Sequence, residues 1–218
     1  MINQICIFGH SGYIGSGLLK AFNKIKYNVL QANIPRPSNN DNFYKFYLNF
    51  FSNFLDKNKN ITTIINCAGS IECKTEKDFL FNSNFDSICQ KVILKKKIKL
   101  QYISLNSTKI FTKGLDNYAL SKKNSNKKFR TNNNFLSVYI DLVFDKKSPH
   151  FNSILNVIKK FWVFPVPVFF PGKIFYPLNR DALVNFICKL INRKNKYHKF
   201  ILLGDIKVYF YELILKVI

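Results

Sequence analysis

A glycine-rich heptapeptide near the start of the chain could bind phosphate. It reads Gly9-His10-Ser11-Gly12-Tyr13-Ile14-Gly15, follows the apolar run Gln4 to Phe8, and precedes a segment with helical spacing of apolar residues. In a strand–loop–helix unit the first glycine permits a tight turn, the second lets backbone approach a pyrophosphate, and the third lets helix pack on strand. The helix N-terminus adds free N–H groups and a positive dipole end. We therefore expect a dinucleotide to bind here; the alternative is a glycine turn without a ligand.

A tyrosine and a lysine four residues apart could transfer protons. Tyr118 and Lys122 would share one face of a helix that begins near Tyr118. An ammonium beside a phenol favours the phenolate, so the pair could exchange a proton with a carbonyl or hydroxyl while hydride moves to or from a nicotinamide. The alternative is an ordinary tyrosine and a solvated lysine. The glycine loop upstream favours the functional interpretation.

Strand and helix signals alternate through the first 143 residues. Helices are expected at 43–55, at 78–95 and from about 118, and strands at 4–8, 28–32, 61–67, 100–105 and 136–143. This alternation predicts right-handed βαβ units, and so an α/β fold with a doubly wound parallel sheet. Such sheets bind ligands at the carboxyl ends of their strands, where the glycine loop and Tyr118 should both lie.

The remainder of the chain predicts a smaller appendage to the same domain. Residues 1–218 are expected to form one domain, to which residues 144–218 contribute a small substrate lobe. Its expected elements are helices at 151–160, 181–191 and 209–217, an extended Pro-broken stretch at 161–172 and a strand at 200–203. The polar stretch 122–134 is either a helix continuation with a loop or a mobile surface segment.

Several motifs, in this order along the chain, resemble the extended branch of the short-chain dehydrogenase/reductase superfamily, the NAD-dependent epimerases and dehydratases. The glycine spacing is GxxGxxG, Asn66-Cys67-Ala68-Gly69 resembles that family's NNAG motif, and Tyr118 with Lys122 matches YxxxK. Asn106 to Phe111 resembles the segment that carries the catalytic hydroxyl, which selects Ser107, with Ser104 as its competitor. Phe79 to Phe85 resembles the conserved asparagine segment, with Asn82 or Asn84 as candidates. Asp181-Ala182-Leu183-Val184 resembles the aspartate-led helix after the substrate loop.

The resemblance implies a Rossmann-like domain with a reduced C-terminal substrate lobe, acting as an NAD(P)-dependent oxidoreductase, epimerase or dehydratase on a nucleotide-linked sugar. Tyr118 would be the acid/base, Lys122 would assist it and reach the nicotinamide ribose, and Ser107 would orient the substrate oxygen. The residues expected to bind the cofactor are Gly9, His10, Ser11, Gly12, Tyr13, Ile14, Gly15, Asn33, Arg36, Cys67, Ala68, Gly69, Asn84, Tyr118 and Lys122. The interval from Ser107 to Tyr118 is shorter than the extended pattern. The alternative is therefore a catalytically reduced sensor or assembly protein of the same fold.

The end of the second expected strand indicates which cofactor is preferred. An acidic residue there would bind the ribose 2′-hydroxyl of NAD, and an arginine nearby would accommodate the 2′-phosphate of NADP. Asn33 is followed by Arg36, and no acidic residue occurs from Asn28 to Asn40. We expect NADP in preference to NAD.

The charge of the chain is unusual, because 34 basic residues oppose 12 acidic ones for a net charge of +22. The electrostatic field of so positive a chain attracts polyanions. Only four of the basic residues are Arg, however, and proteins that bind phosphate groups specifically depend on Arg. Lys, Asn, Ile and Phe share AT-rich codons, and the basic residues are scattered along the sequence apart from Lys95 to Lys97 and the run from Lys122 to Arg130. We therefore favour genome composition over nucleic-acid binding.

The remaining composition excludes several classes of protein. The longest apolar run, Phe161 to Phe170, is about half the length of a membrane span and contains two prolines. Five cysteines show no metal-ligand spacing, so no metal site is expected, and they read as reduced thiols of a cytoplasmic protein. The N-terminus shows no secretory signal. A homodimer is possible, as is common in the family that the chain resembles.

Overall fold

The computed structural model of the chain describes residues 4–39, 41–143, 148, 174–191 and 195–209. The helices are α1 (Tyr13–Lys24), α2 (Phe43–Lys57), α3 (Glu76–Lys95), the 3₁₀ helix η1 (Thr108–Phe111), α4 (Asn117–Lys128) and α6 (Arg180–Leu190). The strands are β1 (Gln4–Phe8), β2 (Asn28–Ala32), β3 (Ile61–Asn66), β4 (Gln101–Ser107), β5 (Phe135–Ile140), β6 (Ile174–Phe175), β7 (Lys199–Leu202) and β8 (Val208–Tyr209).

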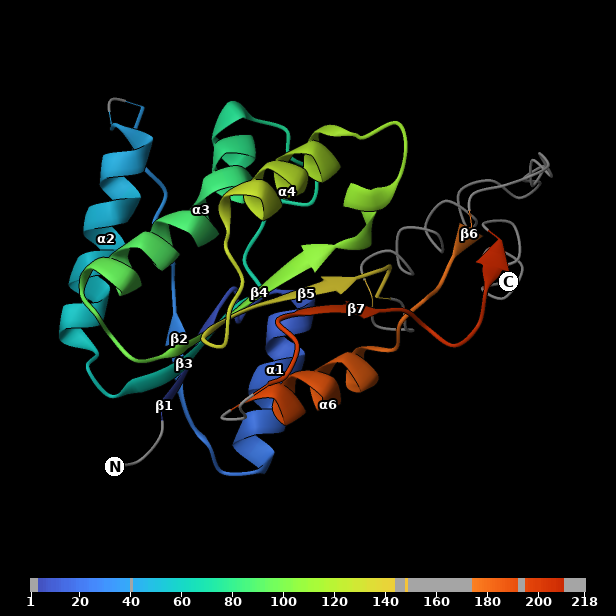
Figure 1. The fold of residues 1–218 in the computed structure, drawn as a ribbon, viewed down its shortest axis with the longest axis horizontal. Coiled ribbons are helices and arrows are strands. Elements are labelled where there is room, and N and C mark those ends of the chain that lie inside the picture. Colours follow the sequence, from blue (N-terminus) through green and yellow to red (C-terminus); the bar gives the residue numbers. More distant parts are fainter. Residues whose placement is uncertain (1–3, 40, 144–147, 149–173, 192–194, 210–218) are drawn as a thin grey trace.

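Six of these strands form one parallel sheet in the order β2-β1-β3-β4-β5-β7. Helices α2, α3 and α4 cover one face of the sheet, and α1 and α6 cover the other (Figure 1). This is the doubly wound, Rossmann-like α/β architecture that the alternation of strand and helix signals predicted. Because every strand of the sheet runs in the same direction, the loops that follow the strands meet at one edge.

The two faces of the sheet have separate apolar cores. Alternate residues of β1 enter each core: Cys6 and Phe8 pack under α2 and α3, whereas Ile5 and Ile7 pack under α1 and α6. All four side chains are fully buried. A strand that is covered on both sides reads as a continuous apolar run, which is why β1 shows no alternation in the sequence.

The second half of the chain agrees with the sequence only in part. Helix α6 and strand β7 occur where they were expected, and the polar stretch that begins at residue 122 continues α4 to Lys128. The expectation of a helix starting at Tyr209 is wrong at that residue, because Val208 and Tyr209 form β8, which pairs antiparallel with β6. The expectations for 151–172 and 210–217 fall on residues outside the described ones.

Helix α6 and strand β7 complete the sheet domain. Helix α6 packs on the same core as α1, and β7 extends the sheet from β5. Of residues 144–218, which were predicted to contribute a small substrate lobe, those of α6 and β7 therefore belong to the sheet domain, whereas 144–147, 149–173, 192–194 and 210–218 lie outside the described ranges. Within those ranges, no helix is long and apolar enough to cross a lipid bilayer.

Candidate functional site

The glycine loop lies at the carboxyl end of β1, where it presses against the loop after β3. Gly9 has a φ of +76°, and a Cβ at this position would lie 2.8 Å from the backbone nitrogen of Ala68. A Cβ on Gly15 would lie 2.1 Å from the carbonyl oxygen of Gly9. Both positions therefore exclude any side chain, and the loop is held close to the strand ends.

The N-terminus of α1 differs from those of the other described α-helices. Its N-cap is Gly12, which is exposed and makes no side-chain cap hydrogen bond. The other N-termini are capped by side chains, those of Asn42, Thr75, Asp116 and Asn179. Beside Gly12, the buried Nδ1 of His10 has no hydrogen-bond partner. An uncapped helix N-terminus behind a glycine loop suits a pyrophosphate, so these residues fit a dinucleotide.

The loop after β3 is fixed by two asparagines. The Asn66 side-chain oxygen accepts a hydrogen bond from the Ala68 amide at 3.0 Å. Asn82, on α3, accepts from the Ser70 amide at 3.0 Å and donates to the Ser70 carbonyl at 2.8 Å. The Cys67 amide donates to the Phe8 carbonyl at 3.0 Å, which ties the start of this loop to β1. Cys67, Ala68 and Gly69 therefore form the second wall beside the glycine loop.

Helix α4 approaches the loop after β3 through the side chain of Lys122. Its side chain is almost fully buried, and its ammonium lies 3.5 Å from the Leu105 carbonyl oxygen. A Cβ on Gly69 would lie 3.5 Å from Lys122 Nζ. Burial raises the pKa of the Cys67 thiol to about 12, and the nearby Lys122 ammonium opposes that shift. The structure thus places Lys122 beside Gly69 of the loop that is predicted to bind the cofactor.

The other two predicted catalytic residues lie on α4 itself and at the end of β4. Tyr118 is half-buried one helical turn earlier on α4, and the Lys109 ammonium sits 5.8 Å from its ring centroid. Ser107 ends β4, and its hydroxyl accepts a hydrogen bond from the Lys109 amide at 3.2 Å. The competitor Ser104 is fully buried and donates to Asp86 at 2.6 Å in the core. The hydroxyl of Ser107 is therefore the one placed at the carboxyl edge of the sheet.

The asparagine candidates on α3 point in different directions. Asn82 is buried against the loop after β3, whereas Asn84 donates to the Leu80 carbonyl and accepts from Lys128 at 2.6 Å. Asn82, which sequence reasoning weighed but did not select for the site, is thus the asparagine that reaches the predicted cofactor loop. Helical periodicity in the sequence could have selected Asn82 over Asn84, because Asn82 shares its helix face with Phe85 and Cys89, which are buried.

Asn33 and Arg36 follow β2 and are both exposed. Arg36 lies close enough to the start of α3 to affect Asp78. The pKa of that carboxyl is lowered chiefly by the Thr75 hydroxyl and, more weakly, by the Arg36 guanidinium. Arg36 is therefore an exposed cation that lies after the end of β2, near the start of α3.

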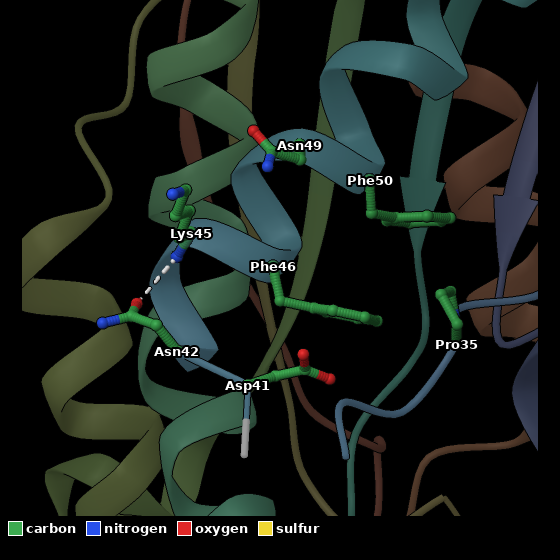
Figure 2. Close-up of a pocket in the computed structure, with 7 residues that line it drawn as sticks. All are labelled: Pro35, Asp41, Asn42, Lys45, Phe46, Asn49 and Phe50. Carbon is green, nitrogen blue, oxygen red and sulfur yellow. Dashed lines mark hydrogen bonds between the residues drawn. The ribbon is translucent and has the colours of Figure 1, made fainter. Parts of the chain in front are cut away.

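A cavity of about 620 Å³ lies beside α2, and the Phe46 and Phe50 rings that line it point toward Pro35 (Figure 2). Asp41, Asn42, Lys45 and Asn49 complete its lining. A second cavity, of about 680 Å³, lies between α6 and residues 202–208. Neither cavity is lined by any residue predicted to be catalytic or to bind the cofactor. The candidate site is instead formed by the loops at the carboxyl edge of the sheet.

Comparison with solved structures shows which proteins share this arrangement. A dTDP-4-dehydrorhamnose reductase from Clostridium acetobutylicum matches with a TM-score of 0.78 at 14% identity, over 98% of this chain and 79% of that one. The same reductase from Bacillus anthracis, solved with NADP, matches with a TM-score of 0.75 at 13% identity, over 100% and 80% of the two chains. The chain has the fold of these reductases.

A third match in this fold is the Bordetella bronchiseptica enzyme WbmG, solved with NAD and UDP. Its TM-score is 0.71 at 12% identity, over 97% of this chain and 77% of that one. The predicted resemblance to extended short-chain dehydrogenases/reductases is thereby confirmed for the fold. No protein-family model and no curated protein matches the sequence.

Proposed function

We propose that the chain binds NADP, or less readily NAD, and catalyses hydride transfer at a secondary alcohol or ketone of a nucleotide-linked sugar, as a reductase, epimerase or dehydratase. The observation that carries the proposal is the meeting of the uncapped, glycine-lined N-terminus of α1, the loop at Gly69 and the buried Lys122 ammonium. Solved structures of the same fold contain NADP, or NAD with UDP, which supports the choice of ligand class.

The cofactor supports are divided between backbone and side chains. Residues 9–15 would hold the pyrophosphate through backbone amides and the α1 dipole, and Cys67, Ala68 and Gly69 would line the wall that Asn82 fixes. Arg36 offers a cation to a 2′-phosphate, beside the uncharged Asn33. A bound nicotinamide supplies or accepts the hydride.

The catalytic proton would be handled by α4. Tyr118 would hold or release a proton at the substrate oxygen, while Ser107 hydrogen-bonds that oxygen. The Lys122 ammonium, buried one turn from Tyr118, would bind the ribose beside Gly69. A positive charge that is already desolvated needs no reorganisation when negative charge develops nearby.

The first test is a fluorescence titration of the purified chain with NADPH and NADH. We expect micromolar binding that is tighter for NADPH, abolished by Gly12→Asp and retained by Tyr118→Phe. The Asp side chain would place a carboxylate where the pyrophosphate should lie, whereas loss of the phenol removes only the acid/base. Binding of neither cofactor would overturn the proposal.

The second test is turnover of nucleotide sugars by variants at neighbouring lysines. Lys122→Met should lower turnover by at least about 100-fold, the usual contribution of acid/base assistance. The matched control Lys123→Met removes an exposed ammonium from the same turn and should leave turnover unchanged. Cofactor binding without turnover of any nucleotide sugar would favour the alternative, a catalytically reduced sensor or assembly protein.

A further inference from the structure

The fold gathers basic residues that the sequence scatters. Because the six strands are parallel, each helix ends, and each following strand begins, at the amino edge of the sheet, opposite the candidate site (Figure 1). Among the described residues, the basic ones that lie in the last turns of the helices α1, α2, α3 and α6, in the connections from these helices to the next strand, or at the first position of that strand are Lys24, Lys26, Lys57, Lys59, Lys95, Lys96, Lys97, Lys99, Lys189, Lys196 and Lys199. We call this set the basic edge.

Acidic residues are nearly absent from these segments. Asp56 is the one acidic residue in the last turns and connections concerned, and it pairs with Lys96 at 2.6 Å. The carboxyl edge is different, because its described loops and first helical turns carry eight acids: Asp41, Glu72, Glu76, Asp78, Asp116, Asp141, Asp181 and Asp205. The excess positive charge of the described chain is therefore concentrated at the edge away from the candidate site.

The basic edge is accessible and wide. All its lysines except Lys96 are exposed. It reaches from the start of β2 to the start of β7, the two outer strands of the sheet. Five strand spacings give a width of about 24 Å, so many ammonium groups can face one extended surface together.

The needs of the fold do not account for this charge. Lysines in the last turn of a helix complement its dipole, but Lys59, Lys99 and Lys199 lie beyond the helix ends. Lys26 and Lys97 have φ values of +58° and +53°, a left-handed conformation that glycine adopts with less strain. Positive charge is thus present where the backbone favours another residue.

Exposed apolar side chains occur in the same segments. Ile25 follows α1, Leu94 lies in the last turn of α3, and Tyr197 precedes β7; they are 54%, 57% and 64% exposed. Lysine ammoniums around aliphatic and aromatic side chains complement an anionic bilayer, whose headgroups attract the charge and whose interface accepts the apolar groups. Nucleic acid fits less well, since Ile and Leu do not stack on bases and arginine forks are scarce.

We propose that the basic edge binds the surface of an anionic lipid bilayer. The chain then lies on the membrane with the carboxyl edge of its sheet, and the candidate site, facing away from the lipid. The attachment is peripheral and salt-sensitive, and it operates whether or not the candidate site binds a dinucleotide.

The test is co-sedimentation of the full chain with vesicles of phosphatidylcholine alone or with 30% phosphatidylserine. We expect binding only to the anionic vesicles, weakening as salt increases. The triple variant Lys59→Glu, Lys97→Glu, Lys99→Glu should bind at least about 100-fold more weakly, since each lysine near such a surface contributes about fivefold. The matched control Lys45→Glu, Lys113→Glu, Lys123→Glu makes the same change in net charge at exposed sites away from the basic edge, and should lose much less.

Two further measurements separate lipid from other polyanions. Leu94→Asn should lower vesicle binding at high salt, because it removes an apolar group without changing the charge. Equal loss in the two triple variants would overturn the proposal in favour of unspecific net charge. Binding of a 20-base-pair DNA duplex at physiological salt, without binding to anionic vesicles, would overturn it in favour of nucleic acid. Circular dichroism confirms that each variant is folded.

Discussion

Two glycines of the α1 loop are expected to separate stability from ligand binding. A Cβ on Gly15 meets the Gly9 carbonyl oxygen at 2.1 Å, whereas a Cβ on Gly12 lies 3.3 Å from that oxygen and Gly12 is exposed. Gly15→Ala should lower the free energy of unfolding by about 3 kcal/mol, the upper range for overpacking. Gly12→Ala should change it by less than about 1 kcal/mol but weaken NADPH binding. Urea unfolding and the fluorescence titration measure both effects, and equal stability losses would contradict this assignment.

Cys67 is expected to lower the free energy of unfolding of the chain as the pH rises above 9. Burial raises the pKa of its thiol to about 12 from an ordinary value of 9.0. Above pH 9 the unfolded chain loses this proton while the folded chain keeps it, so stability falls as pH rises from 9 toward 12. Between pH 8 and pH 10 Cys67→Ala should lose about 1 kcal/mol less than the wild type. Urea unfolding at the two pH values measures this difference, and identical losses would contradict it.

At the scale of elements, one buried carboxylate ties α3 to the sheet. Asp86 accepts hydrogen bonds from Asn66 at 2.6 Å, Tyr102 at 2.8 Å and Ser104 at 2.6 Å, and from Ser125 of α4 at 3.4 Å. Asp86→Ala would leave several buried donors without an acceptor, each of which costs about 1–3 kcal/mol. We therefore expect a loss of at least about 3 kcal/mol in the free energy of unfolding.

The matched control for Asp86 is an exposed aspartate. Asp56→Ala breaks the Lys96 pair, in which the Asp56 side chain is 59% exposed, and should cost less than about 1 kcal/mol. Chemical denaturation compares the two variants. Similar losses would mean that Asp86 does not organise the packing of α3 and α4 on the sheet.

The elements were predictable from sequence because each strand of the sheet enters two cores or ends in a recognisable turn. The runs Gln4 to Phe8 and Ile61 to Cys67 are continuous apolar or β-branched segments, and the structure makes them β1 and β3. The Tyr209 prediction failed for a physical reason. Apolar spacing after Val208 suits a helix, but pairing with β6, distant in sequence, makes residues 208–209 a strand.

The candidate site was predictable to the level of loops and less so for single side chains. Motif order indicated the glycine loop and the loop at Gly69, each of which follows a strand, and Lys122, which lies within α4. It did not resolve Asn82 from Asn84, which differ by about 200° around α3 and face different partners. Which of the two asparagines faces the cofactor loop depends on how α3 packs against the sheet, and the motif in the sequence does not specify that packing.

At the scale of the whole molecule, the distribution of charge could not be read from the order of residues. Lys26, Lys59, Lys97 and Lys199 are far apart in sequence, and nothing in their order along the chain shows that they share one surface. Parallel topology brings them to one edge, because every return from helix to strand ends there. Genome composition can supply lysines, but their separation from the acids of the carboxyl edge exists only in the folded chain.

Lys26 and Lys97, which have positive φ angles, test whether the charge of the basic edge stabilises the fold or binds a partner. Lys26→Gly and Lys97→Gly relieve positive φ angles, so each should raise the free energy of unfolding by about 1 kcal/mol. If the basic edge binds lipid, each should also weaken anionic-vesicle binding by about fivefold. Thermal unfolding and co-sedimentation of the same samples measure the two effects. A gain in stability with unchanged vesicle binding would separate these lysines from the membrane surface, whereas opposite changes would show that the chain retains charge at the expense of stability.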